Sequence, residues 1–276
     1  MSLRINTNVD ALQGYNNLNK TSSAVSKSME RLSSGFRVNS AADDTAGLSI
    51  SERMRGQIRG LAQASTNIGD ATSMVQTAES NLGEVHSMLQ RVRELAVQYK
   101  NGSLATADQT AIQSEVNQLA SEIERIGTSA KFNGISLLST AATVDFQVGA
   151  NDGETISVGT VSLAALITSS GDLFKLGAGN ATAANAATDI SDIDAAINAV
   201  SNTRANFGAV QNRLEYASNA TKSYHENLVG AESRIRDVDM ASEMVALTKN
   251  QVLAQAGTAM LAQANQSPQS VLSLLR

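Results

Sequence analysis

Apolar residues recur with alternating spacings of three and four residues along two long stretches of the chain. The first stretch runs from Met54 to Tyr99, and thirteen of its fourteen seam positions are apolar. The second runs from Ile193 to Val238, with twelve of fourteen apolar. Unbroken heptads of this length predict coiled-coil helices. Because the two stretches have the same length, we expect them to pack against each other.

A shorter helix is predicted between the two long ones. Its apolar positions keep the same rhythm: Ile112, Val116, Leu119, Ile123 and Ile126. Thr106 and Gln109 have the spacing of a capping box, and Gly127 marks the expected end. The turn at 100–103 is short, so we expect this helix to fold back antiparallel on the first long helix.

A β-hairpin is predicted after the short helix. Apolar and polar residues alternate over Val144–Val148 and again over Ile156–Val158. Asn151–Gly153 lies between them and has the composition of a turn.

The apolar rows near the two ends of the chain differ from the two central seams. Near the N-terminus the seam is interrupted by Ser, Thr and Asn, whereas near the C-terminus two adjacent rows make a wide apolar face on one helix. We expect these segments to be marginally ordered until other molecules cover them. The candidate self-assembly residues are Leu18, Val25, Met29, Leu32, Val245, Val252, Leu261, Val271, Leu272, Leu274 and Leu275.

Composition supports thin helical packing and argues against several functions. The 276 residues include one Pro, no Cys, no Trp, five Phe and four Tyr, so helices can be long and large rings are few. The absence of Cys excludes disulfides and thiolate sites, and two His are too few for a His-rich metal site. We therefore expect no metal and no cofactor. A net charge of −5 argues against nucleic acid as a ligand, and no apolar run has the length of a membrane span. The N-terminus shows no secretory signal peptide.

Three classes of function can be compared with these patterns. The first is a structural subunit that assembles with copies of itself, and the second is a signalling coiled coil of the chemoreceptor type. The third, an enzyme, has no site: Gly177–Gly179 lacks the third glycine of a dinucleotide loop, and the acids near Asp192 have no Ca²⁺-loop spacing. A signalling hairpin would turn tightly between its arms, whereas this chain inserts about 70 residues without heptads. We therefore favour the structural class and predict no enzymatic activity.

The fold class predicted is mainly α: an elongated antiparallel helical bundle or coiled coil, with a small β-hairpin region and helical terminal segments. We divide the chain into three parts. Residues 1–45 with 239–276 form a terminal helical coiled-coil domain, and 46–154 with 189–238 form the long-helix bundle with its hairpin. Residues 155–188 break the heptads and are expected as a short variable surface insert.

Several ordered motifs resemble bacterial flagellin. The stretch Arg31–Leu48 (RLSSGFRVNSAADDTAGL) is similar to the family's N-terminal signature, and Ala231–Asp237 with the ending Leu274–Arg276 is similar to its C-terminus. Gln90–Gln98, Phe132–Gly134 and Asp145–Gly149 resemble further flagellin stretches in the same order. The likeness covers about residues 1–150 and 190–276. The hook–filament junction protein shares the N-terminal signature but does not usually share this ending.

The resemblance implies a homopolymer, the extracellular filament used for swimming, with the terminal domain at the filament core. It also implies secretion through the flagellar type III apparatus without a cleaved signal. The partners implied are an export chaperone, the filament cap and the hook-junction proteins.

The resemblance further implies a surface for a Toll-like innate receptor of a host. The positions that match the family's receptor patch are Arg91, Leu95 and Glu115. We expect Arg91 to pair with carboxylates of the partner and Leu95 to fill a small pocket of it, since Arg is enriched at interface hot spots. The alternative is that Leu95 packs against the short helix and Arg91 is a solvated charge.

Overall fold

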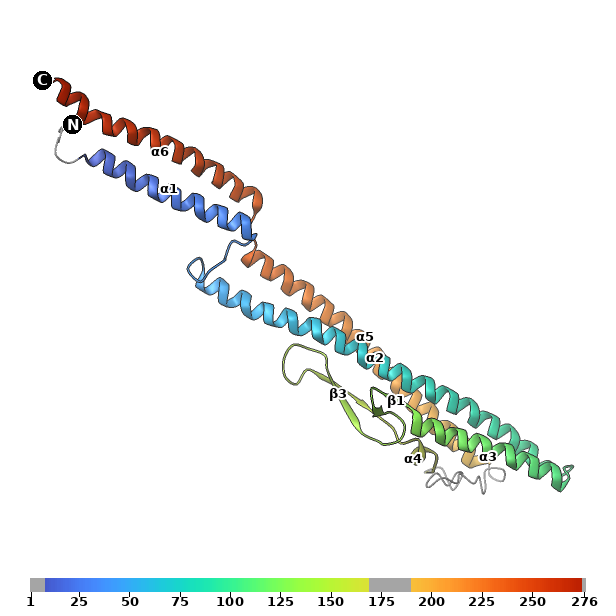
Figure 1. The fold of residues 1–276 in the computed structure, drawn as a ribbon. Helices are drawn as coiled ribbons and strands as arrows, with labels where there is room; N and C mark the ends of the chain where they lie inside the picture. Colours follow the sequence, from blue (N-terminus) through green and yellow to red (C-terminus); the bar gives the residue numbers. More distant parts are fainter. Residues whose placement is uncertain (1–7, 169–189, 275–276) are drawn as a thin grey trace. The chain divides into compact units, whose positions relative to one another are not determined.

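The computed structural model describes residues 8–168 and 190–274, with side chains at 8–167 and 190–266. Six helices dominate this part of the chain (Figure 1). They are α1 (Val9–Ser34), α2 (Thr45–Tyr99), α3 (Thr106–Ser129), α4 (Leu163–Thr168), α5 (Ile190–Arg236) and α6 (Met240–Leu274). The mainly α fold class is thereby confirmed.

Two small antiparallel sheets accompany the helices in the described residues. One pairs β1 (Lys131–Phe132) with β2 (Ile135–Ser136), and the other pairs β3 (Thr143–Gln147) with β4 (Thr155–Gly159). The second sheet is the predicted hairpin. The first was not predicted: its turn consists of Asn133 at φ 46° and Gly134 at φ 81°, a left-handed pair that suits a two-residue hairpin loop.

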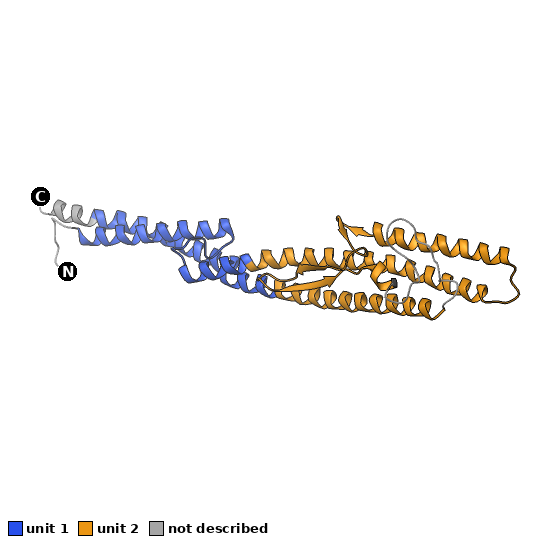
Figure 2. Ribbon diagram, turned by 90° about the horizontal axis from the view of Figure 1, so that it is seen from below, with its two compact units in different colours: residues 1–56, 227–276 blue, residues 57–226 orange. Residues whose placement is uncertain are grey.

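The chain forms two compact units, 1–56 with 227–276 and 57–226 (Figure 2). The first turns of α2 belong with the chain ends, beyond the boundary at residue 45 that the sequence suggested. Their side chains explain this position: Glu52 pairs with Arg236 at 2.9 Å, and Arg55 approaches Glu232 at 3.9 Å. We call the first unit 1 and the second unit 2.

The core of unit 2 follows the predicted heptads. On α2 the seam is buried continuously, and the opposite helix α5 contributes a matching row that ends at Thr221. The buried seam residues of α2 are Leu61, Ala64, Ile68, Ala71, Val75, Ala78, Leu82, Val85, Leu89, Val92 and Ala96. Ion pairs Arg204–Glu79 at 2.7 Å and Arg93–Asp194 at 2.6 Å join the two helices in an antiparallel register. The seam does not extend as far as predicted, since Gln57 is exposed and Tyr224 is 67% exposed.

Helix α3 adds a third layer to this core, and its ends differ from the prediction. Ala105 is the N-cap residue and has no side-chain group that accepts a hydrogen bond from the first turn, so the expected capping box of Thr106 and Gln109 does not form. Gly127 does not end the helix, which continues to Ser129. A Cβ at Gly127 would lie 3.3 Å from Leu163 Cδ2, so this glycine allows α4 to pack closely against α3.

The hairpin β3–β4 rests on α2 and α5 within unit 2. Gly153 at φ 86° forms the turn that the sequence predicted. Asn67 Nδ2 donates to the carbonyl of Gln147 at 3.0 Å, and Thr221 Oγ1 donates to the carbonyl of Val148 at 3.1 Å. One helix side chain from each side therefore holds two consecutive backbone carbonyls of the hairpin.

Residues 155–167 do not form the surface insert that the sequence suggested. Ile156 and Val158 on β4 and Leu163 and Ile167 on α4 are buried in the core of unit 2. The heptads stop in this stretch, but the alternating period that predicts the strand at Ile156–Val158 and the helical period of α4 place these side chains in the core. The remainder of the expected insert, 169–188, lies outside the described residues.

Candidate functional site

Helices α1 and α6 of unit 1 lie side by side and antiparallel, with small residues at their contact (Figure 1). A Cβ at Gly14 would lie 3.3 Å from Leu261 Cδ1, and one at Gly257 would lie 3.5 Å from Leu18 Cδ1. Asn8 caps α1 by accepting from the Ala11 amide, and its Nδ2 donates to the carbonyl of Ala264 at 2.8 Å. The two glycines thus let each helix receive a leucine of the other.

This contact is thin. In the described side chains of α1 and α6, only Ser28 and Leu247 are buried, at 5% and 7% exposure. Leu18, Val25, Leu32 and Leu261 are half-buried along the contact. Four of the predicted self-assembly residues therefore lie where the two helices of one chain meet.

The rest of the apolar surface of the pair is uncovered. Val245 is 70% exposed, Val252 59% and Met29 52%, and these are predicted self-assembly residues as well. Further exposed apolar side chains on the two helices are Val9, Leu12, Tyr15, Met240, Met244, Leu253 and Met260. Two apolar rows near the C-terminus are expected from the sequence: Met240, Leu247, Ala254 and Leu261, and Val238, Val245, Val252 and Ala259. Leu247 and Leu261 of the first row are buried or half-buried, whereas Val245 and Val252 of the second are open. We call these exposed apolar side chains, on α1 and α6 together, the uncovered face.

An open groove of about 720 Å³ also runs between α1 and α6. Gly14 and Gly257 form part of its floor, and Leu253 and Met260 line it together with polar side chains such as Asn17. Four other predicted assembly residues, Val271, Leu272, Leu274 and Leu275, have side chains outside the described set.

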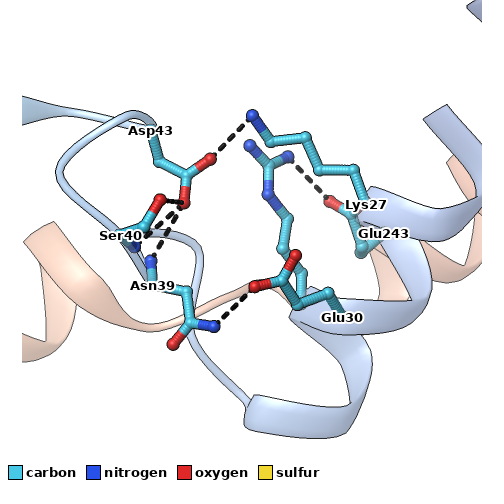
Figure 3. Close-up of polar contacts among 7 residues, drawn as sticks. Lys27, Glu30, Asn39, Ser40, Asp43 and Glu243 are labelled. Atoms are coloured by element: carbon cyan, nitrogen blue, oxygen red, sulfur yellow. Dashed lines mark hydrogen bonds and ion pairs between the residues drawn. The ribbon is translucent and has the colours of Figure 1, made fainter. Parts of the chain in front are cut away.

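A polar cluster fixes the loop that follows α1 (Figure 3). Asp43 pairs with Lys27 at 2.6 Å and accepts hydrogen bonds from the amides of Asn39 and Ser40 and from the Ser40 hydroxyl. The bond from Lys27, followed by those from Ser40 and Asn39, holds the pKa of Asp43 well below its usual range. Nearby, Asn39 Nδ2 donates to Glu30 at 2.7 Å.

The same loop is joined to the link between α5 and α6. Gly35 ends α1 at φ 76°, and its carbonyl accepts from the Val238 amide at 3.1 Å. The Arg37 amide donates to the carbonyl of Arg236 at 2.6 Å, and the Arg236 guanidinium lies 4.7 Å from the centroid of the Phe36 ring. Backbone hydrogen bonds therefore join the segment after α1 to the segment before α6, the two helices that carry the uncovered face. Sequence reasoning missed these contacts, because they join residues about 200 positions apart.

The predicted receptor residues lie in unit 2, where α3 packs on α2. Arg91 Nε donates to Glu115 at 3.0 Å, and Arg91 also pairs with Glu94 at 3.0 Å. The side chains of Arg91 and Glu115 are 52% and 45% exposed. The structure therefore brings these two residues together on the surface.

Leu95 has a different environment. It is 1% exposed and belongs to the hydrophobic core of unit 2. The expectation that its side chain fills a pocket of a partner is therefore wrong for this structure. Leu95 shares one core cluster with Ile112 and Val116 of α3, in line with the first half of the alternative, whereas Arg91 is ion-paired and not a free solvated charge.

The described residues contain no group of three His, Cys, Asp or Glu side chains that could hold a metal ion. Nor does any helix in the described ranges have the length and apolarity to cross a membrane.

Known proteins of similar sequence share the whole length of the chain. The chain is 49% identical over 286 residues to the flagellar filament 33 kDa core protein of Treponema phagedenis, and the matched region covers 99% of each chain. It is 50% identical over 283 residues to a flagellin of Halalkalibacterium halodurans, again with 99% of each chain covered. A solved structure described as a flagellar hook-associated protein of Vibrio parahaemolyticus has a TM-score of 0.59 and 16% identity over 71% of this chain and 100% of that one, and this likeness concerns the fold alone.

Family models match both halves of the chain. The bacterial flagellin N-terminal helical region matches residues 5–143, and the bacterial flagellin C-terminal helical region matches residues 190–275. These two matches leave out only the middle of the chain and a few terminal residues. Together with relatives that are similar from end to end, they show that this chain belongs to the bacterial flagellin family.

Proposed function

We infer that this chain is a structural subunit that polymerises with itself into the bacterial flagellar filament, the organelle of swimming. Membership of the flagellin family and full-length relatives named as filament proteins support this role. They favour the filament subunit over the hook–filament junction protein. The role is structural and involves no catalysis.

The observation that carries the proposal is the uncovered face. Val245 and Val252 lie on a helix that already packs against α1, yet they are 70% and 59% exposed. Transfer of such side chains from water into a contact is favourable, by about 1.5–3 kcal/mol for a fully buried valine. Copies of the chain supply the natural cover in a homopolymer.

The proposed assembly residues then divide by task. Leu18, Val25, Leu32 and Leu261 hold α1 and α6 together within one subunit, whereas Met29, Val245 and Val252 contact neighbouring subunits. Val271, Leu272, Leu274 and Leu275 remain proposed contacts. In this scheme residues 1–45 and 239–276 lie at the filament core, and the long-helix bundle forms the shell around it.

Export and tip assembly follow from the same role. We propose that the chain is secreted by the flagellar type III apparatus into the extracellular filament. Before export a chaperone holds the C-terminal helix. The cap and the hook-junction proteins contact the two ends of the growing filament. The exposed apolar residues of α6 support a need for such a chaperone, since an uncovered surface of this kind promotes premature association.

We also propose that Arg91 and Glu115 contribute to a surface for a Toll-like innate receptor. Their exposure and mutual ion pair support a charged patch that a partner can reach. Leu95 contributes from the core, by holding α2 and α3 in place beneath the patch. Arg91→Ala should weaken receptor activation by monomer and leave the melting temperature unchanged, since exposed ion pairs contribute about 0–1 kcal/mol. Equal activation by the variant and the parent would exclude this role.

Seeded polymerisation tests the main proposal. Purified chain is mixed with fragmented filaments, incubated, sedimented and viewed by negative-stain electron microscopy. Long filaments that form above a critical concentration are the expected result. Dispersed monomers or closed oligomers at every concentration would contradict the proposal.

A further inference from the structure

Methionines are distributed unevenly between the two units. Seven methionine side chains are described, and the four most exposed are all on α1 and α6: Met29 at 52%, Met240 at 50%, Met244 at 50% and Met260 at 68%. In unit 2, Met74 is 2% exposed and Met88 is half-buried against the core. The uncovered face is therefore also the part of the described chain with the most accessible thioethers.

Three of these methionines lie at similar levels along the helix pair. Leu18 lies opposite Gly257, and Arg31 pairs with Glu243 at 3.6 Å. This antiparallel register brings Met29 to the level of Met244, one turn from Met240. Val245 is the next residue along α6 and is 70% exposed. Lys27 and Arg31 also lie near this level, where they pair with Asp43 and Glu243.

A thioether reacts with a peroxide by oxygen transfer. The sulfur lone pair attacks one peroxide oxygen, the O–O bond breaks, and hydrogen peroxide is reduced by two electrons to water as methionine becomes methionine sulfoxide. The product is polar and carries a strong acceptor oxygen, and methionine sulfoxide reductases reverse the change. Access to the sulfur governs which methionines react under mild conditions.

We propose that Met29, Met240, Met244 and Met260 make the uncovered face sensitive to peroxide, so that their oxidation in the free subunit blocks assembly without unfolding it. This inference rests on the proposed function, because it requires the face to be buried between copies. Burial of a sulfoxide oxygen among aliphatic side chains leaves an acceptor without a partner, which is unfavourable. Filament contacts would shield the same sulfurs, so assembly and oxidation oppose each other.

Unit 2 is expected to survive the same treatment. Met74 is enclosed by the core, and peroxide reaches it only when that core opens. The order of reaction is therefore a property of the folded chain: the four exposed sulfurs first, Met74 last.

The experiment treats purified monomer with graded hydrogen peroxide, maps sulfoxides by peptide mass spectrometry and measures the critical concentration of seeded polymerisation. Oxidation of the four exposed methionines should raise the critical concentration by at least about tenfold, with the circular dichroism melt unchanged. Methionine sulfoxide reductases A and B should restore polymerisation, which excludes irreversible damage as the cause.

Two variants separate the cause from its alternatives. The fourfold variant Met29→Leu, Met240→Leu, Met244→Leu, Met260→Leu keeps volume and apolarity and should polymerise after peroxide treatment, whereas Met88→Leu should remain as sensitive as the parent. If the fourfold variant does not polymerise even without peroxide, the reductase treatment of the oxidised parent becomes the test. Restored polymerisation supports the inference, and polymerisation that stays blocked after the sulfoxides are reduced contradicts it. Untreated parent that forms no filaments would contradict the proposed function. Parent that polymerises equally well with all four sulfurs oxidised would overturn this inference alone.

Discussion

Replacing the two open valines of α6 by threonine gives the sharpest estimate of what the uncovered face contributes. Threonine has nearly the shape of valine and a similar helix propensity, so Val245→Thr with Val252→Thr changes mainly polarity. In the single chain these side chains are 70% and 59% exposed, so most of their transfer free energy is gained only on assembly. At about 1.5–3 kcal/mol for a fully buried valine, the remaining burial contributes about 1–2 kcal/mol each. The pair of substitutions should therefore weaken a subunit's association by about 2–4 kcal/mol, or about 30- to 1,000-fold.

The assay is the critical concentration of seeded polymerisation, read from the monomer left in the supernatant after sedimentation. The circular dichroism melt of the monomer should stay within about 0.5 kcal/mol of the parent, because both positions are exposed. Val97→Thr is the matched control: Val97 is 51% exposed on α2 of unit 2, outside the uncovered face. A double variant that polymerises at the parent's critical concentration, or a control that is equally impaired, would refute the reasoning.

Three further predictions concern the monomer. Leu95→Ala should destabilise unit 2 by about 2–5 kcal/mol, because it leaves a cavity at a side chain that is 1% exposed, and thermal or urea unfolding checks this. Thr221→Val should lower the melting temperature, because it removes the hydrogen bond that the Thr221 hydroxyl donates to the Val148 carbonyl. Ser223→Val, at an exposed position of α5, is the control and should leave the melting temperature unchanged. Asp43→Asn should lower stability at neutral pH, because the pKa of Asp43 is depressed in the fold and its stabilising contribution is present above the unfolded value of about 3.9. The difference between variant and parent should shrink as the pH falls below about 4 toward the folded pKa, and a difference that persists there would contradict the assignment.

The long helices could be predicted from sequence because their information is local and repeated. Each heptad of α2 carries its own apolar pair, so an error at Gln57 leaves the rest of the seam intact. The hairpin was equally accessible, since alternation and the Gly153 turn both occur within a short stretch.

The parts that could not be predicted depend on contacts between distant residues. Leu95 lies outside the a/d seam, yet it is buried in one core cluster with Ile112 and Val116 of α3. Gly127 has the sequence character of a helix end, yet it allows the close approach of Leu163. The burial of Ile167 could not be predicted, because the short helix α4 that carries it lies beyond the last heptad and contacts residues distant in sequence.

The sequence predicted which helices carry the candidate site but not which of their apolar side chains stay exposed. The sequence showed that α6 carries more apolar surface than one helix can cover. Which row α1 covers is set by the close approach of Gly14 to Leu261 and of Gly257 to Leu18, and neither contact can be read from spacing alone.

Thiol labelling of a single cysteine at position 252 tests the central claim most directly. The natural chain has no cysteine, so Val252→Cys introduces the only thiol. The rate of modification by a maleimide is measured in dilute monomer and in sedimented filaments of the same variant, with Leu247→Cys as a reference for a side chain covered within one subunit. The account predicts rapid labelling of residue 252 in monomer and a large loss of reactivity in filaments, down to the rate of the reference. Equal labelling of residue 252 in monomer and filament would contradict the claim that copies of the chain cover this face.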